Sequence, residues 1–213
     1  MPDAHKIPEY SMVHYPRRLL EAISLESRDC IPVPSSAVRL LAKNFFNQHQ
    51  TTEAMSRYVS SRFFDDLPDS VLFIDTHGRW SLDYLSTMTY IGFEQLTRGG
   101  LTSFVSLPFV YQGWHGNQLD LYGRGFGYTG VLSSETSQGL VRLSSLIDRL
   151  RTRDFDLVVF GSIIRDWDLF QYLLPYLDKG TTALVVGEDV PSPEKLLDKL
   201  RLTGCQVFVR AIE

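Results

Sequence analysis

The sequence has few cysteines and no long apolar run, features that mark disulfide-rich, zinc-binding and membrane proteins. Its 213 residues include only two cysteines, Cys30 and Cys205, which are far apart and match no CxxC spacing. Neither a disulfide framework nor a zinc site is indicated, and we expect two reduced, buried thiols. No apolar run approaches the ~20 residues that span a bilayer, and the N-terminus lacks the apolar core of a signal peptide. We therefore expect a cytoplasmic protein with no membrane partner.

Long basic runs and common catalytic motifs are also missing. The formal charge is -4, and binding to a nucleic-acid backbone needs clustered Lys and Arg, so we expect no nucleic-acid partner. The sequence has no Gly-x-Ser-x-Gly elbow and no Gly-Lys-Ser/Thr phosphate loop. Gly161-Ser162 stands where a phospho-acceptor receiver would need an aspartate. Nucleophilic and phosphotransfer chemistry therefore have little support.

What the sequence does contain is an alternation of helix and strand patterns. The short apolar run in 155–162 reads as a buried central strand, and 140–151 and 166–177 carry apolar residues at helical spacing. The other expected strands are 71–74, 102–107, 182–187 and 205–210, and the other expected helices are 81–96 and 192–202. Residues 67–213 therefore predict a Rossmann-like α/β domain, an open parallel sheet of about five strands with helices on both faces.

Residues 1–66 predict a helical N-terminal extension. Helices are expected at 16–23, at 35–47 and from Thr51, an N-cap with Glu53 close behind it, to about Phe64. The extension is rich in aromatic residues, namely Phe45, Phe46, Tyr58, Phe63 and Phe64. Such rings need an apolar surface, which is either the α/β domain or a partner chain.

Polar side chains follow several of the expected strands. Open parallel sheets bind ligands beyond the carboxyl ends of their strands, near the point where strand order reverses. The residues expected at that edge are Asp75, Thr76, His77 and Arg79 after the first strand, Ser162 and Arg165 after the third, and Glu188 and Asp189 after the fourth. His77 is either an acid-base or ligand-binding group or a loop histidine. Asp75, Glu188 and Asp189 are either a divalent-cation site or helix caps.

The glycine- and aromatic-rich segment 109–138 is too long for a passive connector and predicts a functional loop or an interface. Within it, Leu121-Tyr-Gly-Arg-Gly-Phe-Gly-Tyr128 lacks the spacing of a dinucleotide fingerprint. It is either a flexible or tightly turned loop, or a mobile flap that brings Arg124 and two aromatic rings over the sheet edge. Aromatic residues are enriched in interface cores, so the candidate interface residues are Trp114, Tyr122, Phe126 and Tyr128.

Three pieces, 121–128, 155–162 and Val186-Gly-Glu-Asp189, together resemble the N-terminal Rossmann-like lobe of bacterial glycosyltransferase-like proteins of the CgeB type. The resemblance covers about residues 68–213 and implies one lobe of a GT-B arrangement, in which a nucleotide sugar binds mainly to the other lobe. Because the chain ends at Glu213, we expect a separate subunit to supply the second lobe, or this lobe to bind a ligand without turning it over.

Asp75-Thr-His77 also resembles the Asp-x-His that opens a cobalamin-binding motif, but Trp80 stands where that motif has glycine. Neither cobalamin nor a divalent cation is favoured, and no cofactor is expected.

Two functions remain open. In a glycosyltransferase, His77 or Asp75 would take the proton of the acceptor hydroxyl, and Arg124 or Arg165 would offset the charge of the leaving phosphate. The alternative is a non-catalytic assembly module, a homo-oligomer among the options, that uses loop 109–128 and the N-terminal helices.

Overall fold

The computed structural model describes residues 10–11, 51–76, 84–125, 127–133, 139–187 and 193–211. Its strands form a wholly parallel sheet in the order β1-β7-β6-β5-β2-β3-β4. The bounds are β1 Tyr10–Ser11, β2 Val71–Ile74, β3 Leu101–Ser103, β4 Gly139–Leu140, β5 Leu157–Phe160, β6 Thr182–Val186 and β7 Gln206–Ala211. The five inner strands follow the order 2-1-3-4-5 along the chain, with the two-residue strands β1 and β4 at the edges. An open parallel α/β sheet was predicted, and the prediction is confirmed.

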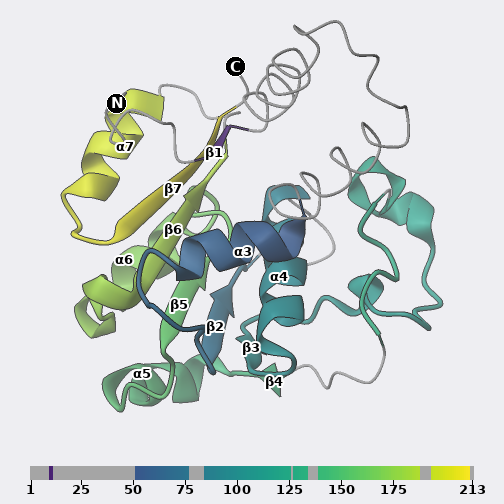
Figure 1. Ribbon diagram of the computed structural model, residues 1–213, viewed down its shortest axis with the longest axis horizontal. Coiled ribbons are helices and arrows are strands. Elements are labelled where there is room, and N and C mark those ends of the chain that lie inside the picture. Colours follow the sequence, from purple (N-terminus) through teal and green to yellow (C-terminus); the bar gives the residue numbers. More distant parts are fainter. Residues whose placement is uncertain are drawn as a thin grey trace, which may run out of the picture.

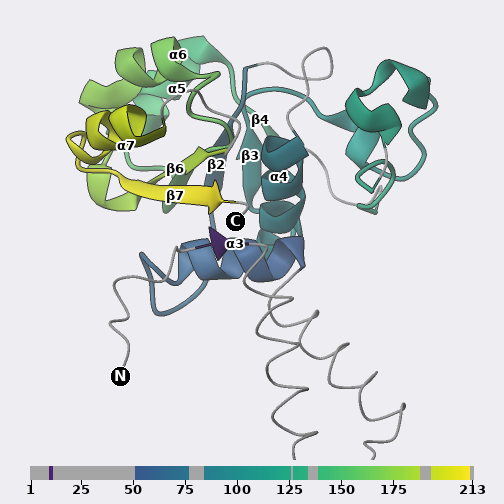
Figure 2. The ribbon, with the colours of Figure 1, turned by 90° about the horizontal axis from the view of Figure 1, so that it is seen from above.

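Helices cover both faces of the sheet (Figures 1 and 2). The helices are α3 Thr52–Ser60, α4 Tyr84–Thr97, α5 Leu143–Arg151, α6 Trp167–Leu173 and α7 Pro193–Arg201. Helices α3 and α4 lie on one face, and α5, α6 and α7 lie on the other. Side chains alternate along each strand, so Phe73 and Val159 join the core under α4, whereas Ile74 and Phe160 join the core under the other three helices. Burial on both faces explains why the strands are continuous apolar runs rather than alternating ones.

Several expected elements end or begin elsewhere than predicted. The helix expected from Thr51 to about Phe64 ends at Ser60. The strand expected at 102–107 stops at Ser103, whose hydroxyl donates to the Val105 carbonyl at 2.6 Å and turns the chain. The helix expected through residue 177 ends at Leu173, and a 3-10 turn, Leu174–Tyr176, follows because Pro175 has no N–H to donate. The helix expected from Leu140 begins at Leu143, since Leu140 belongs to β4.

Of the N-terminal helices, α3 is the one that falls within the described residues. Thr51 caps it as expected, with its hydroxyl accepting from the Ala54 N–H at 3.1 Å. The aromatic rings of Tyr58 and Phe63 contact Phe208 of β7, with ring centroids 6.4 and 6.1 Å apart. These rings therefore pack on the α/β domain, which is one of the two surfaces that the sequence left open. The helices expected at 16–23 and 35–47 lie outside the described residues, and the division at residues 66 and 67 stays a prediction.

The aromatic segment forms a small lobe beyond α4 (Figures 1 and 2), which we define as residues 108–132. It contains three 3-10 turns, Pro108–Val110, Gln118–Asp120 and Tyr122–Gly125, and a bridge between Tyr111 and Leu132. Phe109, Val110, Leu121, Tyr128 and Leu132 are buried there and belong to the hydrophobic core that lies under α4. The described residues of the lobe are thus packed on the core of the domain.

Candidate functional site

The strand order reverses between β2 and β5, and we call the edge of the sheet at the carboxyl ends of these two strands the crevice. The next strand after β2 in the chain, β3, lies on one side of it, whereas β6, which follows β5, lies on the other side. The chain leaves β2 toward α4 on one face and leaves β5 toward α6 on the opposite face, so the two connections diverge. Such a switch point is where open α/β sheets bind ligands. We call the polar residues at this edge, Asp75, Thr76, Ser86, Ser162 and Asp166, the crevice cluster.

Asp75 follows β2 directly and is 5% exposed. Its Oδ2 accepts a hydrogen bond from the hydroxyl of Ser86, a fully buried residue in the first turn of α4. Gly161, at the end of β5, completes this side of the crevice. A Cβ at that position would collide with the Ser86 hydroxyl and with the ring of Phe73, so a residue without a side chain lets α4 approach the strand ends.

Asp166 lies at the other side of the crevice, immediately before α6, and is 1% exposed. Its Oδ1 accepts from the backbone N–H of Thr76 at 2.9 Å and from the Thr76 hydroxyl at 2.6 Å. Ser162, also buried, accepts at its carbonyl from the backbone N–H groups of Arg165 and Asp166 at 3.1 and 3.2 Å. The turn after β5 and the turn after β2 are therefore tied together across the crevice.

The structure brings part of the expected site together. Asp75, Ser162 and the half-buried Arg165 all lie at the carboxyl edge of β2 and β5, as predicted. Arg124 lies instead in the 108–132 lobe, where it is exposed and adopts a left-handed φ of 56°. His77, Arg79, Glu188 and Asp189 fall outside the described residues.

The residues expected at an interface differ in burial and in their contacts. Tyr128 is 1% exposed, and its ring packs edge-on against Phe109 and Tyr84, so it fixes the lobe to the start of α4. Trp114 is half-buried with its ring against Phe109. Phe126 and the side chain of Tyr122 lie outside the described part of the chain. That Arg124 belongs to a mobile flap stays a prediction.

Two members of the crevice cluster were not singled out from the sequence. Ser86 sits within a helix pattern, where a serine carries no signal of its own. Asp166 was read as the start of a helix, and the structure shows its side chain reaching Thr76, 90 residues earlier, rather than capping α6. An aspartate one turn beyond a buried strand is the signal that could have indicated it.

Two further features of the described residues bear on function. No group of three or more His, Cys, Asp or Glu side chains there is arranged to hold a metal ion. No helix among them is long and apolar enough to cross a bilayer.

Comparison with protein-family models, with curated proteins and with solved structures found no match. The likeness to glycosyltransferase-like lobes therefore stays a prediction, and what the chain shows is an α/β domain with an open, all-parallel sheet.

Proposed function

We propose that this chain binds a hydroxyl-rich small molecule, a sugar or a nucleotide, in the crevice between β2 and β5. The observation that carries the proposal is the pair of buried carboxyl groups, Asp75 and Asp166, beyond the ends of the two strands where strand order reverses. Buried carboxyl groups are costly to keep unless they hydrogen-bond, so their clustering at a ligand-binding position favours a functional use.

The chemistry of the crevice cluster favours hydroxyl groups over phosphate as the main point of contact. An ionised carboxylate has about four acceptor positions and no donor, so it recognises sugar and ribose hydroxyls and repels anions. Arg165 carries a positive charge near this edge. It is half-buried and lies three residues after Ser162. It would offset the charge of a phosphate attached to the sugar.

Transfer of a sugar is the activity that the resemblance implies. In such a reaction, Asp75 would accept the proton of the attacking hydroxyl, and Arg165 would stabilise the departing diphosphate. Asp75 is buried and already accepts a hydrogen bond from the Ser86 hydroxyl. This geometry therefore supports binding of a ligand more directly than catalysis of sugar transfer. The assembly alternative has less support, since Tyr128 is used inside the lobe.

The test is a calorimetric titration with nucleotide sugars, nucleoside diphosphates and free sugars. We expect one of these classes to bind saturably to the full chain. The variant Asp75→Asn should weaken that binding by about ten- to a hundredfold, because a hydrogen bond to a charged group contributes roughly 1.5–3 kcal/mol. Asp66→Asn, at an exposed position outside the crevice, is the matched control and should bind as the wild type does.

Two results would overturn the proposal. One is the absence of saturable binding to any of these ligands. The other is binding that Asp75→Asn and Asp66→Asn leave equally strong, which would place the ligand elsewhere on the chain.

A further inference from the structure

A cleft opens where the start of α3, one side of α4 and the 108–132 lobe meet (Figure 1). Its volume is about 500 Å³, far more than the few water-sized voids of an ordinary protein interior. The residues that line it are Thr51, Thr52 and Glu53 from the start of α3, Met88, Ile91 and Gln95 from α4, and Gly127 and Val131 from the lobe. A surface hollow of this size has room for several large side chains.

The side chains of Met88 and Val131 make part of this cleft apolar. Val131 is 43% exposed and Met88 is half-buried, while Ile91 is buried. On the polar side, the Thr52 hydroxyl already donates to the Gln95 side chain at 2.9 Å. Covering Met88 and Val131 with apolar groups would be favourable, because it removes apolar surface from water.

Glu53 gives the cleft a negative charge, and it is the one ionisable side chain among the described residues that line the cleft. Its carboxylate pairs with the Arg57 guanidinium at 2.9 Å, and both side chains are about half exposed. An exposed pair of this kind contributes little to stability, so Glu53 can also approach a second cation. The cleft therefore suits a partner whose apolar face is flanked by positive charge.

Residues 35–47, which lie outside the described part of the chain, have this chemistry. The sequence predicts a helix there, with one apolar face made by Val38, Leu41, Ala42, Phe45 and Phe46. Arg39 and Lys43, one turn apart, flank that face, and the segment has no acidic residue. Asn47 precedes Thr51 by four residues, so at most roughly 14 Å of extended chain separates the end of the segment from the cleft.

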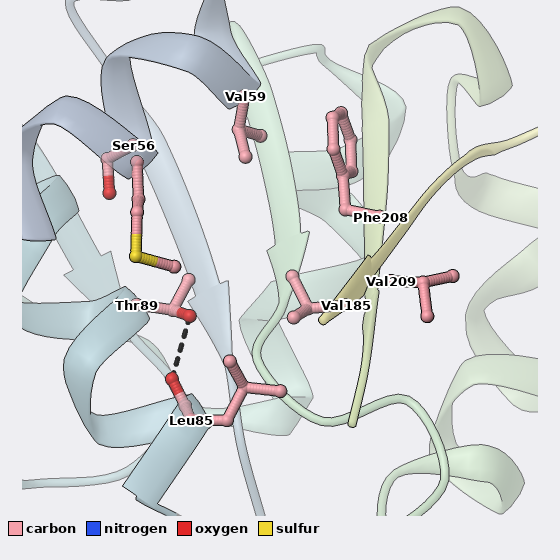
Figure 3. Close-up of a pocket in the computed structure, with 8 residues that line it drawn as sticks. Ser56, Val59, Leu85, Thr89, Val185, Phe208 and Val209 are labelled. Atoms are coloured by element: carbon pink, nitrogen blue, oxygen red, sulfur yellow. Dashed lines mark hydrogen bonds between the residues drawn. The ribbon is translucent and has the colours of Figure 1, made fainter. Parts of the chain in front are cut away.

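Two other hollows among the described residues suit the segment less well. The space beneath α3 has a volume of about 30 Å³, which is too small for a phenyl ring (Figure 3). The hollow at the amino end of β5 has a volume of about 240 Å³, and its lining includes two arginines and two aspartates, namely Arg149, Arg153, Asp156 and Asp178. An apolar helix face would cover charged groups there, which is costly.

We propose that residues 35–47 of the same chain dock in this cleft as a helix, with the apolar face on Met88 and Val131. Phe45, close to the end of the segment that leads to Thr51, enters the cleft, and Lys43 lies within reach of Glu53. Docking holds the N-terminal extension on the domain and covers the apolar surface that the cleft exposes. This inference does not depend on the crevice ligand, because the cleft shares no residue with the crevice cluster.

The test is photo-crosslinking of the full chain with p-benzoylphenylalanine in place of Phe45. The benzophenone group inserts into C–H bonds that lie next to it, and mass spectrometry locates the product. We expect a product within one chain that joins position 45 to Met88. Placing the same group at Asn44, on the opposite face of the predicted helix, should lower the yield of that product about tenfold.

A pair of variants tests the wall of the cleft. Val131→Asp puts a charge on the apolar wall and should lower the yield from position 45 to Met88 by about tenfold, because covering an unpaired charge is costly. Leu119→Asp makes the same change at an exposed position of the lobe outside the cleft and should leave the yield unchanged. Circular dichroism checks that both variants are folded.

The outcomes separate docking within the chain from the other occupants of the cleft. A product within one chain, formed from position 45 and lowered by Val131→Asp, supports the proposal. Products that join isotope-labelled to unlabelled chains would assign the segment to the cleft of a second copy and would overturn it. Products only at residues outside the cleft, or no product from position 45, would overturn it as well and leave the cleft to a different partner.

Discussion

At the scale of single residues, the packing around the crevice requires that residue 161 has no Cβ atom. Gly161 has no side chain, and the space that a Cβ would need is taken by the ring of Phe73 and the Ser86 hydroxyl, which bonds to Asp75. The nearest atoms belong to a buried ring and a buried helix residue, neither of which can swing into solvent. The absence of a side chain at Gly161 therefore allows the contact that holds the carboxyl group of Asp75, a candidate ligand-binding group, in place.

We predict that Gly161→Ala lowers the free energy of unfolding by about 1–3 kcal/mol, the usual cost of overpacking a core. Urea denaturation monitored by circular dichroism measures this. Gly180→Ala is the control, because the nearest neighbour there is the side chain of Asp178 at 3.3 Å and the position is exposed. Equal stability of the Gly161 and Gly180 variants would contradict the close approach of α4.

Tyr128 gives a prediction about pH. Burial raises the pKa of its hydroxyl above the ordinary value of 10.0. The folded state then binds more protons than the unfolded state above about pH 10, so the free energy of unfolding should fall as the pH rises through that range. Denaturation midpoints between pH 8 and 11 should show this fall, and Tyr128→Phe should make it shallower. A fall of the same steepness in the variant would assign it to other groups.

At the scale of elements, the contact between α3 and α4 decides how the N-terminal part of the chain meets the domain. Gly92 is buried in the middle of α4, and Thr52 and Ser56 of α3 lie against it. The Thr52 hydroxyl also donates to the Gln95 side chain at 2.9 Å. Small residues thus let the two helix backbones approach each other closely.

The sign of the effect of Gly92→Ala tests this contact. In an ordinary helix interior, this exchange stabilises by roughly 0.5–1 kcal/mol, because glycine loses more backbone freedom. Here a Cβ would meet the Thr52 carbonyl, so we expect destabilisation by about 1–3 kcal/mol instead. Urea denaturation reports the sign, and a stabilised variant would show that α3 yields easily.

At the scale of the whole molecule, different elements cover the two hydrophobic cores that lie on either side of the sheet. Three helices cover one face, whereas the other depends on α4, α3 and the 108–132 lobe. Val59, Tyr58 and Phe63 of the α3 region contact the core that includes Phe208. Removing α3 would therefore expose part of that core.

Two truncations test this dependence. A chain that begins at Thr51 keeps α3 and its cap, and a chain that begins at Leu67 loses both. We expect the shorter chain to be less stable than the longer one by at least about 3 kcal/mol, since each fully buried apolar side chain contributes roughly 1.5–3 kcal/mol. Thermal unfolding measures the difference. Equal stability would support a domain that begins at residue 67 and stands by itself.

The sequence by itself determined where most elements lie. Val71–Ile74 is a strand as expected. The strand predicted at 182–187 is one residue longer than β6, and the strand predicted at 205–210 is shifted by one residue from β7. Such runs can be read locally, because burial on both faces requires an unbroken apolar stretch. The carboxyl-edge positions of Asp75, Ser162 and Arg165 followed from the same reasoning.

Only the tertiary structure decided which of these residues meet. The strand order put β5 rather than β3 across the crevice from β2, joined Thr76 to Asp166, placed Ser86 on Asp75, and buried Tyr128 against α4. The physical reason is that an apolar or polar pattern reports whether a side chain is buried, and not which distant side chain buries it. Contacts across 90 residues depend on how the sheet is assembled, and that assembly is a property of the whole chain.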